Sequence, residues 1–443
     1  MTLRDRKLFG TDGVRDIANA GRMTPEIALK LGRAFVKAHK VRKVVVGRDT
    51  RLSCRMLESA LISGLSSEGA EVYLCGIIPT PAVSYAVKAL NADGGAVISA
   101  SHNPAEYNGI KFIGADGCKL SDAEELAIED MLDTEPNTSP NIGRVHDCPE
   151  MVEDYAKHIA SLLKPQAACD NTVFDCANGA SALSVPYLVL RSEFSSLRTQ
   201  IISHDYDGLN INKSCGVMHM ERLTGYVKEH GLSLGFAFDG DADRVLISDK
   251  YGRVIDGDIM LWVLGRWLKT QCIPGSDKVA ATVMSNMALE AHLSEDGIQT
   301  LRCPVGDRYV LELMRETGAA LGGEQSGHII ASAYTSTGDG LCTAMLFLNA
   351  IHDLGEDTSG LIERFGRYPQ KLTNLMLKRP REAVNMKAID AIVSGYSMRV
   401  KGGRIFIRTS GTEPLLRILV EAPEREVVEE ISGQLALKLA EYC

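Results

Sequence analysis

The chain has 443 residues, of which 45% are hydrophobic and 24% are charged, as in a soluble globular protein. This length exceeds what one ordinary core supports, so we expect several domains. The formal net charge of −9 argues against nucleic acid or a membrane surface as a partner. A phosphate-binding site in such a chain would have to be a local basic pocket.

The cysteines and the N-terminal residues bear on the cellular compartment. The 11 cysteines are scattered and form no Cys-x-x-Cys pair, which argues against a zinc site, a redox pair and a disulfide scaffold. The N-terminus carries no apolar signal segment, and no apolar run approaches the length of about 18 residues that a transmembrane helix needs. We therefore expect a cytoplasmic protein.

The first part of the chain alternates between helical and strand patterns. Thr24-Pro25-Glu26 is a good helix N-terminus, and the apolar stripe that follows it includes Leu31 and Phe35. Alternation of helices and strands predicts βαβ units and a largely parallel sheet. Helices are expected at 24–39, at about 54–68, after Pro81 and at 121–132, and strands at 43–47, 71–75 and 96–98.

A segment rich in proline, asparagine and aspartate at 133–150 indicates the first domain boundary. Two further α/β units follow it, and the last part of the chain has the pattern of a smaller α+β domain. The expected strands lie at 172–175, 200–202, 232–238, 245–248, 278–283, 404–408 and 416–420, and the expected helices lie around Trp262 and Trp267, at 341–352 and from Glu424. The expected domains are 1–150, 151–252, 253–368 and 369–443.

The predicted strand at 96–98 ends in the polar segment Ser99–Pro104. Small polar residues followed by Asn-Pro indicate a loop, because Pro104 disfavours helical geometry at the preceding residue. Ser101 is therefore expected on an exposed turn at the carboxyl end of a strand, where open α/β sheets bind ligands. His102 beside it could orient or exchange protons. An ordinary loop serine would show the same local pattern.

Three aspartates follow the predicted strand at 232–238. Asp239, Asp241 and Asp243 alternate along backbone expected to be extended, so their carboxylates can face one side and bind a divalent cation such as Mg²⁺, Mn²⁺ or Ca²⁺. An EF-hand loop would need glycine and glutamate where this chain has Arg244 and Lys250. A solvated acidic turn is the remaining alternative.

Two other loops are rich in donors and acceptors. In the segment 408–417 hydroxyl groups and a glycine are bracketed by two arginines, a set that suits a phosphate dianion, although an exposed turn would look alike. The residues concerned are Arg408, Ser410, Gly411, Thr412 and Arg417. In the segment 322–328, Glu324, Ser326 and His328 offer the mixed groups that recognise sugar hydroxyls, and a hairpin turn is the alternative.

Lys111 follows Ser101 by ten residues and could stabilise phosphoryl oxygens, unless it is a surface lysine. A serine near a divalent cation, with cationic side chains nearby, can carry a phosphoryl group by positioning and charge neutralisation. These residues together favour phosphoryl transfer.

The motifs resemble those of a known superfamily. SASHNP (99–104), DGDADR (239–244), GEQSGH (323–328) and RTSGTEP (408–414) resemble the α-D-phosphohexomutases, and FGTDGVR (9–15), NGIKF (108–112) and VGDRYV (305–310) resemble their bacterial phosphoglucosamine mutase branch. The resemblance implies three related mixed-sheet α/β domains and a C-terminal α+β domain around a central cleft. It also implies a phosphosugar substrate, and a homodimer is compatible with it.

Each site residue gains a role from this resemblance. Ser101 would be the phosphoserine and would hold one Mg²⁺ together with Asp239, Asp241 and Asp243. Arg15, His102, Lys111 and Arg244 would surround the transferring phosphoryl group. Glu324, Ser326 and His328 would contact the sugar, and Arg408, Ser410, Gly411, Thr412 and Arg417 would grip the distal phosphate.

The implied reaction converts glucosamine 6-phosphate to glucosamine 1-phosphate through a bound 1,6-bisphosphate, and supplies UDP-N-acetylglucosamine for cell-wall synthesis. Glucosamine 1,6-bisphosphate or a similar sugar bisphosphate would serve as the activator. Asp16, Ala105-Glu106 and Val217-Met218-His219 depart from the expected pattern. A phosphoglucomutase or phosphomannomutase of the same superfamily is therefore the nearest alternative. A phosphatase and a non-catalytic phosphosugar binder represent other classes of function.

Overall fold

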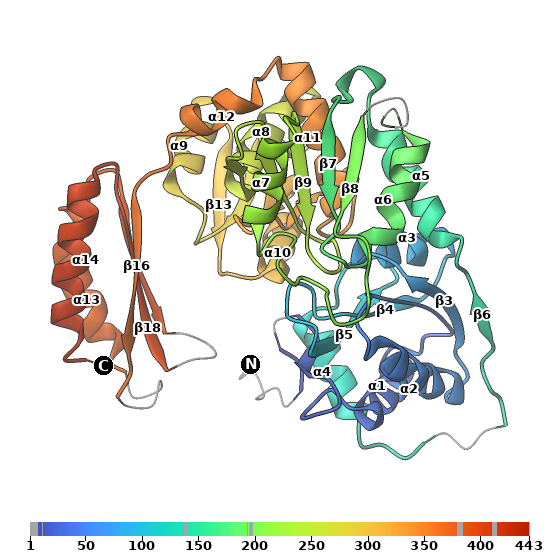
Figure 1. The fold of residues 1–443 in the computed structure, drawn as a ribbon. Helices are drawn as coiled ribbons and strands as arrows, with labels where there is room; N and C mark the ends of the chain where they lie inside the picture. The colour runs from blue at the N-terminus through green and yellow to red at the C-terminus, as the bar shows by residue number, and fades with distance from the viewer. Residues whose placement is uncertain are drawn as a thin grey trace. The chain divides into compact units, whose positions relative to one another are not determined.

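The computed structural model describes residues 8–10, 12–136, 140–192, 194, 198–378, 384–409 and 414–442 (Figure 1). The chain divides into two compact units, one of Met1–Ser285 with Leu293–Glu363 and one of Asn286–His292 with Arg364–Cys443. In the described residues the first unit contains three β-sheets and the second contains one. Among the residues that the structure describes, no helix is both long enough and apolar enough to cross a membrane.

The first sheet has the strand order β1-β5-β4-β2-β3-β6. β2 pairs in parallel with β3 and β4, whereas β5 runs antiparallel to β4 and β1. The predicted parallel pairing of the strands at 43–47, 71–75 and 96–98 is confirmed. The sequence did not predict β5, which is antiparallel to β4 because the short connection 99–106 is below the dozen or more residues of a parallel crossover. The strands are β1 (Val14–Ile17), β2 (Lys43–Arg48), β3 (Glu71–Ile77), β4 (Gly94–Ile98), β5 (Tyr107–Gly114) and β6 (Val145–Asp147).

The helices of this part begin at the residues that suit a helix N-terminus. The Thr24 side chain accepts a hydrogen bond from the backbone N–H of Ile27, and Ser121 and Glu124 form a capping box. In the core, Phe35 stacks on Phe112 with ring centroids 4.4 Å apart. The helices are α1 (Pro25–His39), α2 (Cys54–Ser67), α3 (Thr80–Ala89) and α4 (Asp122–Met131), and α1 packs against both α2 and α4.

The second and third sheets are also mixed, with orders β11-β10-β9-β7-β8 and β13-β12-β14-β15. In the second sheet β7 pairs in parallel with β8 and β9, whereas β10 runs antiparallel to β9 and β11. In the third sheet β12 pairs in parallel with β13 and β14, and β15 runs antiparallel to β14. Their strands are β7 (Thr172–Asp175), β8 (Thr199–Ile202), β9 (Leu234–Phe238), β10 (Val245–Asp249), β11 (Val254–Ile255), β12 (Lys278–Thr282), β13 (Gln299–Cys303), β14 (Leu321–Gly323) and β15 (Ile329–Ala331). The helices are α5 (Met151–Leu162), α6 (Ser181–Arg191), α7 (Met220–Glu229), α8 (Gly257–Thr270), α10 (Asp307–Thr317) and α11 (Gly340–Leu354), with a 3₁₀ turn at Pro165–Ala167.

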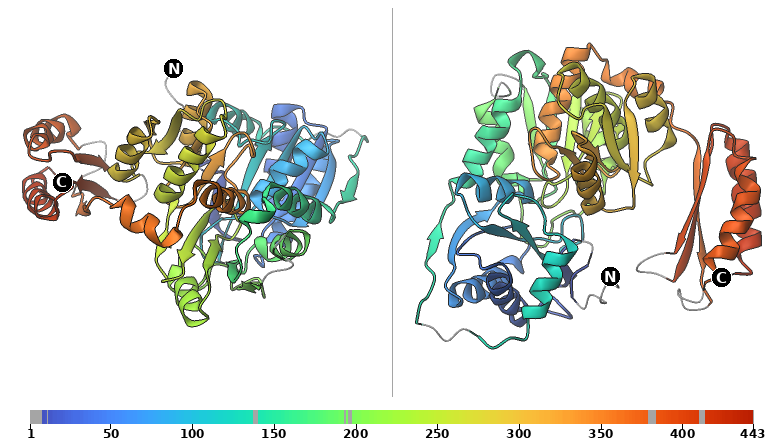
Figure 2. Two further views of the ribbon diagram at one scale, coloured as in Figure 1. Left: turned by 90° about the horizontal axis from the view of Figure 1, so that it is seen from above. Right: turned by 180° about the vertical axis from the view of Figure 1, so that it is seen from behind.

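The second unit has an antiparallel sheet of order β16-β18-β17, and two helices cover the same face of it (Figure 2). Its elements are β16 (Gln370–Met376), α13 (Met386–Ser397), β17 (Arg404–Thr409), β18 (Leu415–Glu421) and α14 (Arg425–Leu439). The chain passes from one unit to the other just before α9 (Met287–Glu295), within α9, and again within α12 (Thr358–Phe365). Mixed α/β sheets followed by an α+β sheet confirm the expected fold class, whereas the exact domain limits stay a prediction.

Candidate active site

The turn after β4 buries Ser101 rather than exposing it. Ser101 is only 2% exposed, so the prediction of an exposed turn is wrong. The reason is a contact that is remote in sequence, because Ser101 Oγ donates a 2.6 Å hydrogen bond to Asp239 Oδ2. The serine hydroxyl and the acidic cluster therefore meet in one site, although they belong to different sheets.

The acidic cluster lies directly after β9. The prediction of extended backbone is wrong here, because the chain turns: the N–H of Ala242 donates to the Asp239 carbonyl at 3.1 Å, and Ala242 has a φ of 56°. The turn still gathers the side chains of Asp239, Asp241 and Asp243. All three are buried, and one carboxylate oxygen from each lies within 4.8 Å of the others.

The electrostatics of this cluster fit a divalent cation. Burial and the neighbouring carboxylates of Asp243 and Asp241 raise the pKa of Asp239 well above its ordinary value. The Oδ1 atoms of Asp241 and Asp243 are buried, and neither has a hydrogen-bond partner among the described residues. Buried oxygens without partners and an all-carboxylate donor set are what an oxygen-preferring metal ion needs.

Lys111 on β5 carries a positive charge into the acidic cluster. Its Nζ lies 2.8 Å from Asp241 Oδ2, 3.7 Å from Asp243 Oδ2 and 3.2 Å from Asp12 Oδ2. Burial opposes its charge, but the carboxylates of Asp12 and Asp241 raise the pKa of Lys111 above its ordinary value. The side chain is 3% exposed, which excludes the alternative of a surface lysine.

Three charged residues near Lys111, which are Asp12, Lys119 and Asp307, were not predicted as part of the site. Asp12 accepts hydrogen bonds from Arg15 and, at 2.8 Å, from Lys119, and Lys119 also pairs with Asp307. Burial opposes ionisation of Asp12, but Lys111, Lys119 and Arg15 hold the pKa of this carboxyl well below its ordinary value. Asp12 and Asp307 lie within the FGTDGVR and VGDRYV motifs, which could have indicated that they belong to the site. Lys119 lies in no such motif.

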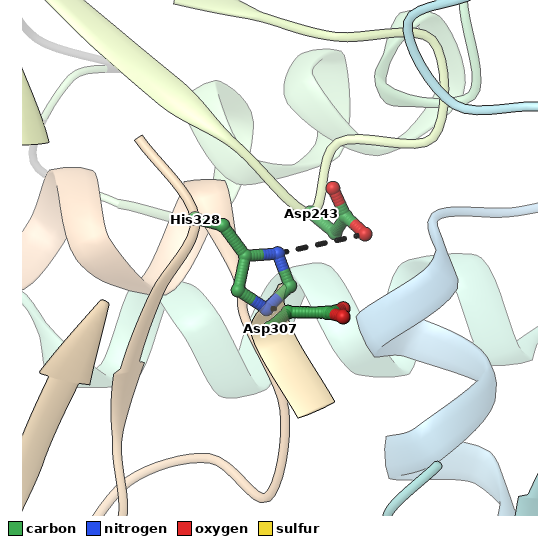
Figure 3. Close-up of side chains that lie close together, drawn as sticks. All are labelled: Asp243, Asp307 and His328. Atoms are coloured by element: carbon green, nitrogen blue, oxygen red, sulfur yellow. Dashed lines mark ion pairs between the residues drawn. The ribbon is translucent and has the colours of Figure 1, made fainter. Parts of the chain in front are cut away.

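His328 lies between two carboxylates (Figure 3). Its Nδ1 is 3.7 Å from Asp243 Oδ2, and its Nε2 is 3.7 Å from Asp307 Oδ2. Burial lowers the pKa of His328, but Asp243 and Asp307 outweigh this effect and raise it. Arg244 forms an isolated β-bridge with His328, and its backbone N–H donates to Asp239 Oδ1 at 3.2 Å.

The segment that follows β14 is indeed a hairpin turn, since β14 and β15 pair antiparallel. Glu324 and Ser326 share this turn with His328. Glu324 Oε1 accepts from the N–H of Gly306 at 3.1 Å, and Ser326 Oγ donates to Glu324 Oε2 at 3.3 Å. The hairpin therefore places a carboxylate, a hydroxyl and an imidazole on one turn, and its His328 contacts the acidic cluster.

His102 lies beside the serine. Its Nδ1 is 3.5 Å from Ser101 Oγ. Burial and the positive charges of Arg244 and Arg15 lower the pKa of His102 to about 4. The imidazole is therefore uncharged near neutral pH in this arrangement.

The second unit carries the two arginines of the 408–417 segment. Arg408 on β17 and Arg417 on β18 are directly opposite in the antiparallel register. Burial and the charge of Arg417 lower the pKa of Arg408. Two arginines in this arrangement are the residue type that an anion would favour, so the 408–417 segment stays a predicted phosphate site. Ser410, Gly411 and Thr412 lie outside the described residues.

The geometry of the first unit suits phosphoryl transfer. A buried hydroxyl contacts a carboxylate of a potential metal site, and the side chain of Lys111 and the backbone of Arg244 border the same carboxylates. Phosphoryl transfer requires little from a protein beyond positioning and stabilisation of negative charge.

Four family models match successive parts of the chain. They are described as phosphoglucomutase/phosphomannomutase alpha/beta/alpha domain I (residues 6–139), domain II (153–252), domain III (256–368) and C-terminal domain (372–438). A solved phosphoglucomutase/phosphomannomutase family protein from Burkholderia thailandensis has a TM-score of 0.82 and 26% identity and covers 97% of both chains. The Aspergillus fumigatus N-acetylphosphoglucosamine mutase, solved with GlcNAc-6P and magnesium, shares the fold with a TM-score of 0.71 and 15% identity, covering 98% of this chain and 96% of that one.

Curated relatives indicate the branch of the family to which the chain belongs. The phosphoglucosamine mutase of Lactococcus lactis subsp. cremoris (strain SK11) is 44% identical over 441 residues, which cover 96% of each chain. The phosphoglucosamine mutase of Bacillus subtilis (strain 168) is 40% identical over 441 residues, which cover 97% of each chain. The chain therefore belongs to the phosphoglucomutase/phosphomannomutase family of isomerases, and within it to the phosphoglucosamine mutases.

Proposed function

We propose that this enzyme interconverts glucosamine 6-phosphate and glucosamine 1-phosphate through phosphorylated Ser101 and a bound glucosamine 1,6-bisphosphate. The observation that carries the proposal is the 2.6 Å contact between Ser101 Oγ and Asp239 Oδ2. It joins a hydroxyl nucleophile to a cluster of carboxylates, two of whose buried oxygens accept no hydrogen bond from the residues that the structure describes and so suit a metal. Asp239, Asp241 and Asp243 would hold one Mg²⁺ with the phosphate on Ser101, and the bound ion would neutralise charge on the phosphoryl oxygens.

The chemical step needs one bond to break and one to form. The C1 hydroxyl of glucosamine 6-phosphate attacks the phosphorus on Ser101, the P–Oγ bond breaks, and the hydroxyl proton ends on Ser101 Oγ. His102, with Nδ1 3.5 Å from that oxygen, is within reach to pass the proton on. Lys111, Arg15 and Arg244 supply positive charge for the phosphoryl oxygens.

The second half of the reaction returns a phosphoryl group to the serine. Ser101 Oγ attacks the 6-phosphate of the bisphosphate, the bond between phosphorus and the C6 oxygen breaks, and that oxygen receives the serine proton. The sugar must turn over between the two steps. Glu324, Ser326 and His328 contact its hydroxyls, and Arg408, Ser410, Gly411, Thr412 and Arg417 bind whichever phosphate is remote from Ser101.

A substrate comparison tests this proposal. The values of kcat/KM are measured for glucosamine, glucose and mannose 6-phosphates with a sugar bisphosphate activator present and with a Ser101→Ala preparation as the blank. We expect the highest value for glucosamine 6-phosphate. A higher value for glucose or mannose 6-phosphate would favour the phosphoglucomutase or phosphomannomutase alternative, and free phosphate as the main product would favour a phosphatase.

A further inference from the structure

A buried ion pair lies beneath the serine turn. Asp49 and Arg51 follow β2, and Arg51 Nε is 2.9 Å from Asp49 Oδ2 with both side chains 0% exposed. Asp49 also contacts the serine turn, because Ser99 Oγ donates to Asp49 Oδ2 at 2.7 Å. Ser99 Oγ in turn accepts a 2.9 Å hydrogen bond from the backbone N–H of Ser101. The proposed catalytic steps do not use this pair, yet it is connected to the nucleophile.

The two terminal nitrogens of the Arg51 guanidinium donate to backbone carbonyls of the serine turn and of the first residue of β5. Its Nη2 donates to the Ser101 carbonyl at 3.0 Å and to the Asn103 carbonyl at 2.8 Å. Its Nη1 donates to the Tyr107 carbonyl at 3.0 Å and also to the Pro104 carbonyl. A planar guanidinium can serve several carbonyls in this way, which the single ammonium of a lysine does less well.

A second donor, in the loop between β8 and α7, reaches the same two carbonyls. Asn212 lies between β8 and α7, is 6% exposed, and donates from Nδ2 to the Ser101 carbonyl at 2.8 Å and to the Asn103 carbonyl at 3.0 Å. Each carbonyl therefore accepts from both Arg51 and Asn212. Gly240 of the acidic turn lies against the Ser101 carbonyl as well, since a Cβ there would be 2.6 Å from that oxygen.

These hydrogen bonds act on a backbone conformation that needs support. Ser101 has a φ of 51°, in the left-handed region that residues with a Cβ disfavour. Such a conformation persists only where the surroundings determine it, and it often marks a functional residue. In this conformation Ser101 Oγ reaches Asp239, and rotation of the turn would move the hydroxyl away from the carboxylates.

We propose that Asn212, together with Arg51, is a positioning residue that holds the backbone of Ser101 in the conformation required for phosphoryl transfer. This inference rests on the proposed role of Ser101 as the nucleophile. Asn212 touches the Ser101 and Asn103 carbonyls rather than the reacting atoms, so its effect falls on the chemical step and not on sugar binding. The alternative is that the amide only stabilises the contact between two parts of the first unit.

The test variant is Asn212→Gly. Asn212 has a φ of 58°, which glycine adopts freely, so this change removes the amide and keeps the turn. Asn178→Gly is the matched control, because Asn178 also has a positive φ, of 49°, but its Nδ2 donates to the Asn210 carbonyl and to Cys215 Sγ instead. Asn212→Asp is the second variant, since it keeps the shape and replaces the donor by an acceptor that faces two carbonyls.

The readout is the rate at which dephosphorylated protein gains a phosphoryl group from glucosamine 1,6-bisphosphate, followed by intact mass. We expect Asn212→Gly to lower this rate by about ten- to a hundredfold, as small misplacement of a reacting group does. Asn212→Asp should lower it at least as much. The KM for glucosamine 6-phosphate and the thermal midpoint should change no more than in Asn178→Gly, whose phosphorylation rate should stay near that of the wild type.

The experiment distinguishes failure of the proposed function from failure of the positioning role. If wild-type protein takes up no phosphoryl group at Ser101, the proposed function fails and this inference fails with it. If the wild type is phosphorylated and Asn212→Gly matches its rate, the positioning role alone is wrong. Equal losses in Asn212→Gly and Asn178→Gly, or a rise in KM without a fall in the phosphorylation rate, would also overturn it.

Discussion

Removal of the Lys111 ammonium should lower the stability of the protein, because this group neutralises the buried carboxylates of the acidic site. The contacts of 2.8, 3.2 and 3.7 Å to three carboxylates are each worth roughly 4 to 6 kcal/mol of Coulomb attraction at an effective dielectric constant of about 20. Desolvation of the ammonium offsets much of this, and removal of one partner from a buried ion pair costs about 3–5 kcal/mol. We therefore expect Lys111→Met to be destabilised by about that amount.

Thermal unfolding is the direct assay for this change. One kcal/mol shifts the midpoint of a domain of 150–250 residues by about 2–4 °C, so Lys111→Met should melt roughly 6–20 °C below the wild type. Lys88→Met is the matched control, because Lys88 is an exposed lysine on α3 and should change the midpoint little. Addition of magnesium chloride should raise the thermal midpoint more in Lys111→Met than in the wild type, because in the variant no ammonium group neutralises the carboxylates.

A small effect would contradict this reasoning. If Lys111→Met melts within about 2 °C of the Lys88→Met control, the ammonium does not balance the buried carboxylates. An equal response of the wild type and Lys111→Met to magnesium chloride would show that the ion and the ammonium do not compensate the same charges.

Three further predictions follow from single residues. Burial raises the pKa of Asp339 to about 6, above the ordinary 3.8. The protonated carboxyl therefore contributes to the free energy of unfolding in full below pH 4, and this contribution, about 3 kcal/mol in all, is lost as pH rises through 6. Asp339→Asn should abolish this loss, which is checked by measuring thermal midpoints at pH 5 and pH 8. If the midpoint falls equally between these two pH values in the variant and in the wild type, the prediction is wrong. Arg408→Ala should raise the KM for glucosamine 6-phosphate by about ten- to a hundredfold, as loss of a hydrogen bond to a charged group does, and an unchanged KM would remove Arg408 from the phosphate site. Gly240→Ala should lower stability by about 1–3 kcal/mol in thermal unfolding, because its Cβ would lie 2.6 Å from the Ser101 carbonyl, and wild-type stability would show that the turn can move aside.

Local sequence signals located the loops of the site well. Ser101 follows a glycine-bounded apolar strand, and the aspartates of 239–243 follow another, so both loops could be placed at strand ends from periodicity and turn residues alone. The helix start at Thr24 and the capping box at Ser121 were likewise visible in the sequence, since caps depend on residues only a few positions apart.

Burial and long-range pairing had no such local signal. Nothing near Ser101 in the sequence indicates that Asp239 and Arg51 cover it, because these contacts depend on how separate sheets pack. Lys111 and Lys119 resemble surface lysines in sequence, yet Lys111 is buried and the Lys119 side chain is only 13% exposed, and both pair with carboxylates from other segments. The antiparallel β5 was also missed, because the alternation of helices and strands does not show which strand pairs with which.

The central claim is that Ser101 carries the phosphoryl group. Dephosphorylated protein is incubated with glucosamine 1,6-bisphosphate, and the modified peptide is located by mass spectrometry beside a Ser101→Ala control. We expect one phosphoryl group on Ser101 of the wild type and none on the control. Phosphate on another residue, or mutase activity that persists in Ser101→Ala, would contradict the account.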